Sequence, residues 1–422
     1  MKVLFLNLMF APSVGFLCFY LVPPGERSVF ALVYIFLSFF IVLVYSRFIS
    51  LSNRGKIFTW NLFPYFLILY GLIYSYLPRW EIQPHGMIDA PVLWMGKSTH
   101  LVERFFHGME FLPNNPDWKF PNYPIGIPII FAIPSVFIGT SSSLIPQFFT
   151  VLMSMCFLGL CFHLANSIHD KKSNILYWVF VASVIFNIKF ISVQSDLCAD
   201  YPISIGLALL VYAFLGKKNK FDQSVFIGII LGFLLTLKNE MLIVVSIYIF
   251  LIFAINLLFK RSFYNPRLIL IHLVLVAFPI TLNRFLMPVV PSDFSFTFLS
   301  SPDAFQILIN RTFKILTSFF NYYIMEQRGL EIILTFLLLF IGSRRINFIL
   351  LSFWMIVFSY NFLFLFTRLN IEEHLSDAYI RIAFQLYLIL PMALLCKWNS
   401  LYYLAIRVLK NRVLYLKKNF LR

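Results

Sequence analysis

Apolar runs of about 17–25 residues recur from one end of this chain to the other, and each is long enough to cross the roughly 30 Å hydrocarbon core of a bilayer as an α-helix. Inside hydrocarbon, backbone polar groups must bond within their own segment, which favours helices. The alternating pattern of a membrane β-barrel is absent. Only 12% of the residues are charged, against roughly 25% in soluble globular proteins. The sequence therefore predicts an all-α integral membrane protein.

The runs predict about twelve transmembrane helices in a single polytopic membrane domain, residues 1–422, because no linker or soluble domain interrupts them. The first run could instead be a signal peptide, but Pro23-Pro24-Gly25 after it is no small-residue cleavage site, so we interpret it as an uncleaved span. The predicted spans are 3–22, 28–46, 57–76, 144–166, 174–192, 199–215, 223–237, 241–259, 268–290, 329–342, 348–367 and 378–395.

The distribution of Lys and Arg predicts the orientation, because these residues stay on the cytoplasmic side. One set of segments holds 21 of the 34 Lys and Arg residues, and its only acidic residues are Asp170 and Asp222. We therefore expect both termini to be cytoplasmic and the basic face to meet anionic lipid headgroups. No basic stripe lies on a soluble domain, so nucleic acid is not an expected partner. The segments are the N-terminus, 47–56, 170–174, 216–222, 260–267, 343–347 and 397–422.

Two outer segments are not predicted to be ordinary spans. Residues 124–141 are apolar, but three prolines kink them and counting them as a span would put basic loops outside, so we expect a re-entrant or interfacial helix. The loop 77–123 is too long for a mere connector. Residues 90–112 within it alternate polar and apolar at helical spacing and predict an amphipathic helix on the outer surface, with Lys97 and Arg104 at lipid headgroups.

Ionisable residues close to a bilayer are costly, so each is a candidate functional residue. Most fall on the predicted outer side, in four places. These places are the loop 77–123 with Asp89, the start of the sixth span with Asp200, the turn Lys238-Asn239-Glu240, and the segment from Glu372 through His374 to Arg381.

Five short patches follow one another in the sequence: MIDAPVLWMGKSTHL (87–101), FPNYPIGIP (120–128), CADYPISIGLAL (198–209), GFLLTLKNEML (232–242) and EEHLSDAYIRIAFQLYLILP (372–391). In this order they resemble motifs of the GT-C superfamily of polytopic glycosyltransferases, which use polyprenyl-phosphate sugars. The sequence departs from the family pattern at four places, which bear on the acceptor and on fine substrate choice. Asn122 stands where many relatives have Asp, Thr236-Leu237 interrupts Thr-Lys, Met241 replaces Gly, and Glu373 replaces the Trp before His374.

The resemblance implies a GT-C-like bundle and an inverting transfer from a polyprenyl-phosphate sugar to a lipid-linked glycan or cell-surface acceptor. Such a transfer needs a carboxylate to take the acceptor proton and cations to hold the departing phosphate. The family pattern makes Asp89 the general base. The residues expected to bind substrate are Lys238 and Arg381 at the phosphate with His374 beside them, Glu240 and Asp200 orienting these cations or the sugar hydroxyls, and Asn122 and Tyr123 in the second patch.

Plainer interpretations stand beside these. Asp89 is alternatively a helix N-cap, a position where Asp is common. Lys238-Asn239-Glu240 is alternatively a solvated turn with a local ion pair, and Asp200 an ordinary helix start. His374 and Arg381 alternatively snorkel to the interface. Asn122-Tyr123-Pro124 is alternatively only a turn.

Metal is left open, since some relatives use a divalent cation. The cysteine and histidine spacing itself indicates neither a disulfide framework nor a zinc site, and no cofactor is otherwise implied. The short chain without appended domains favours a bacterial inner membrane. The rival functions are a transporter or flippase of lipid-linked sugars, a glycan polymerase or ligase, and a purely structural membrane protein. Outer-edge charges and the long 77–123 loop count against a transporter, which typically has internal repeats and midplane sites.

Overall fold

The chain folds into a bundle in which every regular element of the described residues is a helix. This computed structural model describes residues 2–46, 59–82, 94–109, 123–142, 144–168, 170–187, 191, 199–216, 219–258, 264–285, 302–326, 329–367 and 370–420. The helices of the N-terminal half are α1 (Lys2–Leu21), α2 (Arg27–Tyr45), α3 (Thr59–Ile82), α4 (Gly96–Phe106), α5 (Gly126–Ile138), α6 (Leu144–Ala165), α7 (Lys171–Ile185) and α9 (Asp200–Leu215).

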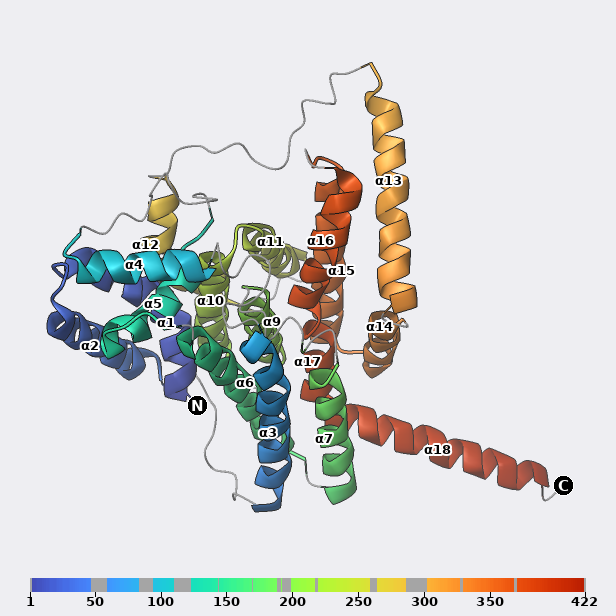
Figure 1. Cartoon of the computed structure of the whole chain (residues 1–422). Coiled ribbons are helices and arrows are strands. Elements are labelled where there is room, and N and C mark those ends of the chain that lie inside the picture. Colours follow the sequence, from blue (N-terminus) through green and yellow to red (C-terminus); the bar gives the residue numbers. More distant parts are fainter. Residues whose placement is uncertain are drawn as a thin grey trace.

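The C-terminal half continues with further helices, and the last of them projects from the bundle in Figure 1. They are α10 (Lys220–Leu237), α11 (Met241–Leu258), α12 (Pro266–Phe285), α13 (Ala304–Phe320) with the π-helical turn η3 (Asn321–Glu326), α14 (Leu330–Ile341), α15 (Arg344–Phe364), α16 (Ile371–Leu386), α17 (Ile389–Cys396) and α18 (Trp398–Phe420).

Six helices in the described part of the chain are long and apolar enough to cross a membrane, namely α1, α2, α6, α10, α11 and α15. A seventh span results if Ile380–Cys396 and Trp398–Val408, which meet at 65°, are counted as one. Shorter apolar helices lie within α3, α5, α9, α12 and α14. The architecture is therefore that of an all-α membrane protein, and the expectation of twelve crossings stays a prediction.

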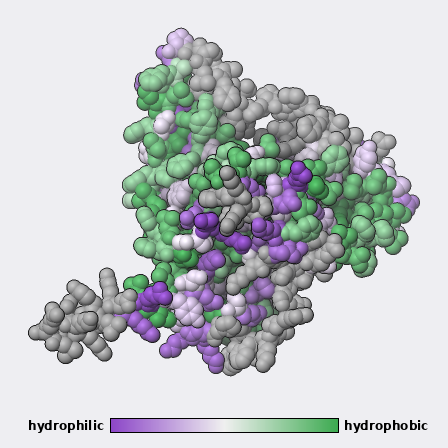
Figure 2. Space-filling model, turned by 180° about the vertical axis from the view of Figure 1, so that it is seen from behind, coloured by the Kyte–Doolittle hydropathy of each residue, from purple (hydrophilic) through white to green (hydrophobic). Residues whose placement is uncertain are grey.

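The outer surface of the bundle is suited to lipid. In α2, Phe36 and Phe39 are 69% and 65% exposed, and Phe66 and Tyr70 of α3 are likewise exposed. Figure 2 shows broad apolar areas on the flanks of the molecule. Apolar patches of this kind are rare on soluble monomers and mark surfaces that meet a partner or a membrane.

Helix α10 lies at the centre of the bundle and packs closely on α12. Gly228 and Gly232 are four residues apart on α10. A Cβ on Gly228 would lie 2.5 Å from the carbonyl oxygen of Ile269, and a Cβ on Gly232 would lie 2.7 Å from that of Leu273. Small residues at this spacing let two helix backbones approach within a membrane. The approach fixes α10, whose C-terminal end carries Lys238, against the rest of the bundle.

Segments that the charge pattern assigns to one side of the membrane meet in the structure. Arg345 Nη1 donates to the carbonyl oxygen of Gly216 at 2.9 Å, and the Tyr264 hydroxyl donates to that of Phe214 at 3.1 Å. The first bond joins the predicted cytoplasmic segments 216–222 and 343–347, and the second brings the segment 260–267 to Phe214, two residues before Gly216. This clustering agrees with a common side for the three loops.

The amphipathic helix expected over 90–112 is present as the shorter α4, which lies across the bundle in Figure 1. Its Leu101, Val102 and Phe105 are buried and Glu103 is exposed. The expectation that Lys97 meets lipid headgroups is wrong, because its side chain is 2% exposed and burial lowers its pKa to about 8. Amphipathic spacing shows which face of a helix a lysine occupies, but it does not show whether that face meets lipid headgroups or is covered by neighbouring helices.

The segment expected to be re-entrant forms α5, a largely buried helix of 13 residues. At 1.5 Å per residue it spans about 20 Å, which is short of the roughly 30 Å hydrocarbon core. Its length fits a helix that does not cross, while its depth in a membrane stays a prediction.

Three features differ from expectation. The predicted last span 378–395 is divided between α16 and α17, with the break at Tyr387-Leu388. Pro391 explains the break, since proline cannot bond to the carbonyl group four residues earlier and its ring clashes there. The helices α13 and α18 fall in stretches for which no helix was expected, and their amphipathic spacing was the signal overlooked.

Candidate functional site

Asp200 is the centre of a buried ion cluster and the first residue of α9. Its side chain is 1% exposed, and its Oδ1 lies 3.2 Å from Lys238 Nζ. Its Oδ2 accepts a hydrogen bond from Arg381 Nε at 3.2 Å. The N-terminal end of a helix stabilises negative charge, so the position suits a carboxylate. One carboxylate therefore pairs with cations that lie 38 and 181 residues away along the chain.

Lys238 reaches Asp200 because α10 stops at Leu237 and the next residue is extended, with φ −154° and ψ 150°. Its Nζ also lies 3.7 Å from Glu240 Oε1. Burial by itself would lower the pKa of Lys238, but the charges of Asp200 and Glu240 raise it above its usual value. The ammonium group is thus held in its charged form.

Gln385 and Tyr360 complete the cluster, and neither was identified from the sequence. Gln385 lies one helical turn after Arg381 on α16, and its Nε2 donates to Asp200 Oδ1 at 2.6 Å. The Tyr360 hydroxyl of α15 donates to Gln385 Oε1 at 3.3 Å. A glutamine within an apolar run, four residues after an arginine, was the available signal for Gln385. No sequence pattern distinguished Tyr360 from the other tyrosines.

The cluster contains two cations and two carboxylates, so its charges balance. Lys238 and Asp200 are almost fully covered, whereas Arg381 and Glu240 keep 17% and 25% of their side chains exposed. Glu240 Oε2 is buried and has no hydrogen-bond partner among the described residues. A ligand would therefore approach the cluster over Arg381 and Glu240.

The second sequence patch packs on the end of α10 through Gly126. A Cβ at this position would clash with the backbone carbonyl of Thr236, two residues before Lys238. Tyr123, just before α5, is half-buried and packs edge-on against Trp94 with ring centroids 6.1 Å apart. The first patch thus contacts the second, and the second contacts the fourth.

We expect Gly126→Ala to lower the free energy of unfolding by about 1–3 kcal/mol, the usual cost of an inserted methyl group in a packed core. The clashing atom is backbone, so it cannot move aside as a side chain can. Thermal unfolding of the purified protein in detergent measures the effect. Gly71→Ala is the control, because its nearest neighbours are ring atoms at the end of Phe186. Equal melting temperatures for the two variants would contradict the close packing of α5 on α10.

Several alternative interpretations can be compared with this geometry. Asp200 is more than a helix start, since it contacts two cations. Lys238 and Glu240 form a local ion pair, but Lys238 is buried rather than in a solvated turn. Arg381 bonds to Asp200 instead of only reaching for the interface. The structure therefore brings Asp200, Lys238, Glu240 and Arg381 into one cluster.

Other predicted site residues are not part of what the structure describes. Asp89 and Asn122 lie outside the described residues. His374 lies in α16, two turns before Arg381 on the same helix, and only its backbone is described. Among the described residues no group of three His, Cys, Asp or Glu side chains is placed to hold a metal ion.

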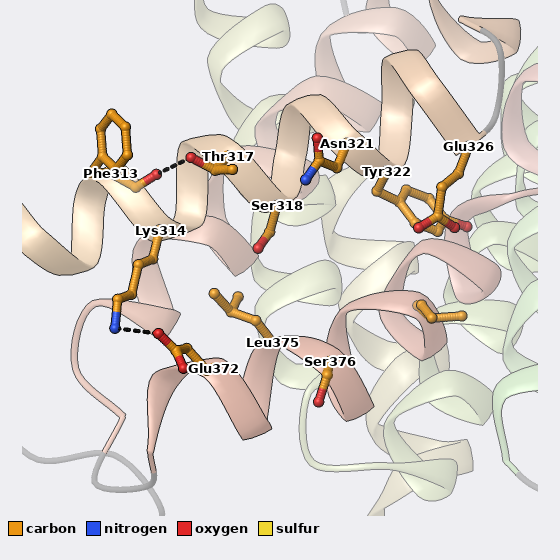
Figure 3. A pocket seen from close by; sticks show the side chains of 11 residues that line it. Phe313, Lys314, Thr317, Ser318, Asn321, Tyr322, Glu326, Glu372, Leu375 and Ser376 are labelled. Atoms are coloured by element: carbon orange, nitrogen blue, oxygen red, sulfur yellow. Dashed lines mark hydrogen bonds and ion pairs between the residues drawn. The ribbon is translucent and has the colours of Figure 1, made fainter.

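A groove of about 500 Å³ runs between α13–η3 and α16 (Figure 3). Glu372, Leu375, Ser376 and Ile380 line it from α16, and Lys314 of α13 forms a 2.6 Å ion pair with Glu372. These α16 positions follow helical spacing on the face opposite to Arg381 and Gln385. The groove and the Asp200 cluster therefore lie on opposite faces of one helix.

Comparison of the chain with protein-family models, with curated proteins and with solved structures gives no match.

Proposed function

We propose that this protein is an inverting membrane glycosyltransferase of the GT-C type, with about twelve transmembrane helices and cytoplasmic termini. It would move a sugar from a polyprenyl-phosphate donor to a lipid-linked glycan or cell-surface acceptor, on the outer side of a bacterial inner membrane. The observation that supports this proposal best is that the described parts of all five sequence patches are linked by contacts. Trp94 contacts Tyr123, Gly126 contacts Thr236, Lys238 contacts Asp200, and Asp200 contacts Arg381.

The chemistry assigns a part to each charge. Asp89 takes the proton from the acceptor hydroxyl as the oxygen attacks the anomeric carbon and the bond to the phosphate oxygen breaks. The polyprenyl phosphate leaves with an additional negative charge, which Lys238 and Arg381 stabilise. Asp200 holds both cations in place and keeps them charged before the donor arrives. Because the cations pair with carboxylates of equal total charge when no donor is bound, the free-energy cost of burying these charges is limited.

Arg381→Gln is expected to lower kcat/KM for the donor by about 10- to 100-fold, because a hydrogen bond to a charged group contributes roughly 1.5–3 kcal/mol. The measurement is release of polyprenyl phosphate from a panel of polyprenyl-phosphate sugars by the reconstituted protein. Arg311→Gln is the matched control, since Arg311 is half-buried on α13 and donates to the carbonyl oxygens of Leu365 and Thr367. An unchanged kcat/KM for the donor in Arg381→Gln would contradict the phosphate assignment.

The same preparation tests the rival function. Movement of lipid-linked sugar across proteoliposomes without any sugar transfer would support a flippase and reject the proposed enzyme. Sugar transfer without transbilayer movement would support the enzyme.

A further inference from the structure

The C-terminal helix α18 leaves the bundle sideways (Figure 1). Its first part, Trp398–Val408, makes an angle of 65° with Ile380–Cys396. The latter segment is apolar enough to cross a bilayer together with its continuation. With that segment along the membrane normal, α18 runs closer to the membrane plane than to the normal. At 23 residues the helix is about 35 Å long.

The first two turns of α18 are hydrogen-bonded to the α6–α7 turn and to the start of α7. Trp398 Nε1 donates to the carbonyl and hydroxyl oxygens of Ser173, each at 2.9 Å. The Tyr402 hydroxyl donates to Asp170 Oδ2 at 2.6 Å, and Asn399 Nδ2 donates to the carbonyl oxygen of Ser167 at 3.3 Å. These bonds come from two helical turns of α18, so they set its direction as well as its position.

The charge and hydropathy of α18 separate onto two faces at the positions the structure describes. Leu401, Ala405 and Val408 follow one another at helical spacing, whereas Arg407 and Lys410 lie on the opposite side and are exposed. Val408 exposes 52% of its side chain although it is apolar. The sequence of the helix contains no Asp or Glu and continues with Arg412, Lys417 and Lys418.

Further positive charge lies beside this helix. Lys171 and Lys172, exposed at the start of α7, follow directly on Asp170, to which Tyr402 is bonded. Hydrophilic side chains gather in Figure 2 where α18 leaves the bundle, below the apolar flank. The exposed lysines at the start of α7 therefore lie close to the second turn of α18.

We propose that α18 lies on the cytoplasmic surface of the membrane and binds the anionic headgroups of phospholipids. An exposed apolar face next to a basic face is the pattern of a helix in the bilayer interface. A cytoplasmic leaflet carries negative surface potential, which attracts basic residues next to a transmembrane helix. A second copy of the chain is a poorer occupant, because it would bring the same excess of cations against this helix.

Hydrogen–deuterium exchange of the full-length protein tests this proposal in two nanodisc preparations. One bilayer contains phosphatidylcholine alone and the other contains phosphatidylglycerol as well. The amides of α18 are expected to exchange more slowly in the anionic bilayer, while those of α15 exchange equally in both. The double variant Arg407→Gln/Lys410→Gln should reduce the protection of α18 by about 30-fold, since each cation near an anionic surface contributes about fivefold to binding. Arg407→Lys/Lys410→Arg keeps the charge and should keep the protection.

A second measurement uses the unaltered protein. Raising the salt concentration to about 1 M shortens the Debye length to roughly 3 Å and should remove the difference between the two bilayers. Equal exchange in both bilayers at low salt would overturn the proposal, as would full protection in the Gln variant. Protection that rises with protein concentration in place of anionic lipid would assign the surface to a second copy instead.

Discussion

Replacing Asp89 with asparagine is expected to lower the turnover of a polyprenyl-phosphate sugar by about 10²–10⁴-fold, the usual contribution of a general base. Asparagine keeps the size of the side chain but cannot accept the proton of the acceptor hydroxyl. Because this proton moves only during the reaction, the affinity for the donor should stay unchanged. Single-turnover sugar transfer and equilibrium donor binding, measured on the same preparation, separate the two effects.

Asp303→Asn is the matched control for this variant. Asp303 is an exposed carboxylate at the N-cap of α13 and makes no side-chain capping hydrogen bond. Its replacement should leave both turnover and donor binding as they are. Full turnover in Asp89→Asn would reject Asp89 as the base and favour the interpretation of this residue as a helix cap. Loss of donor binding together with turnover would assign Asp89 to substrate binding.

Asp200→Asn should lower the free energy of unfolding by about 3–5 kcal/mol, the typical cost of removing one partner from a buried ion pair. The substitution leaves Lys238 and Arg381 close together without the carboxylate that balances them. Asparagine has nearly the same volume, so the loss comes from charge rather than from a cavity. The measurement is thermal unfolding of the purified protein in detergent.

Glu372→Gln is the control, because it makes the same chemical change in an ion pair on α16 that is exposed. Its melting temperature should stay close to that of the unaltered protein, as surface ion pairs contribute little. The double variant Asp200→Asn/Arg381→Gln should lose less free energy of unfolding than the two single variants lose together. The second substitution removes a cation that Asp200→Asn has left without its carboxylate partner. Additive effects, or equal melting temperatures for Asp200→Asn and Glu372→Gln, would contradict the ion cluster.

Helix positions were readable from the sequence because they depend on local properties. The predicted spans 28–46 and 144–166 correspond to Arg27–Tyr45 and Leu144–Ala165 within one residue at each end. Pro391 already contained the information for the break between α16 and α17, and the amphipathic spacing of α18 could have been read in the same way. These differences from expectation reflect local signals that were overlooked.

Pairing of the charges was beyond what the sequence could specify. The resemblance predicted that Asp200 and Glu240 orient either the cations Lys238 and Arg381 or the sugar hydroxyls, but it could not specify which carboxylate meets which cation. Gln385 was missed because one polar residue in an apolar run has several structural explanations. The burial of Lys97 was missed because it depends on which helices cover α4.

The sequence by itself determined that this chain is an assembly of membrane helices, since segment length and hydropathy decide whether a helix is stable in lipid. Only the tertiary structure decided that Arg381 bonds to Asp200 across 181 residues of chain. This contact depends on how the helices pack. Close contacts between helices, for example that of Gly232 in α10 with α12, determine where the ends of the helices meet. The sequence has no periodic pattern that specifies this packing, because each apolar helix face could pack against several other faces of similar composition.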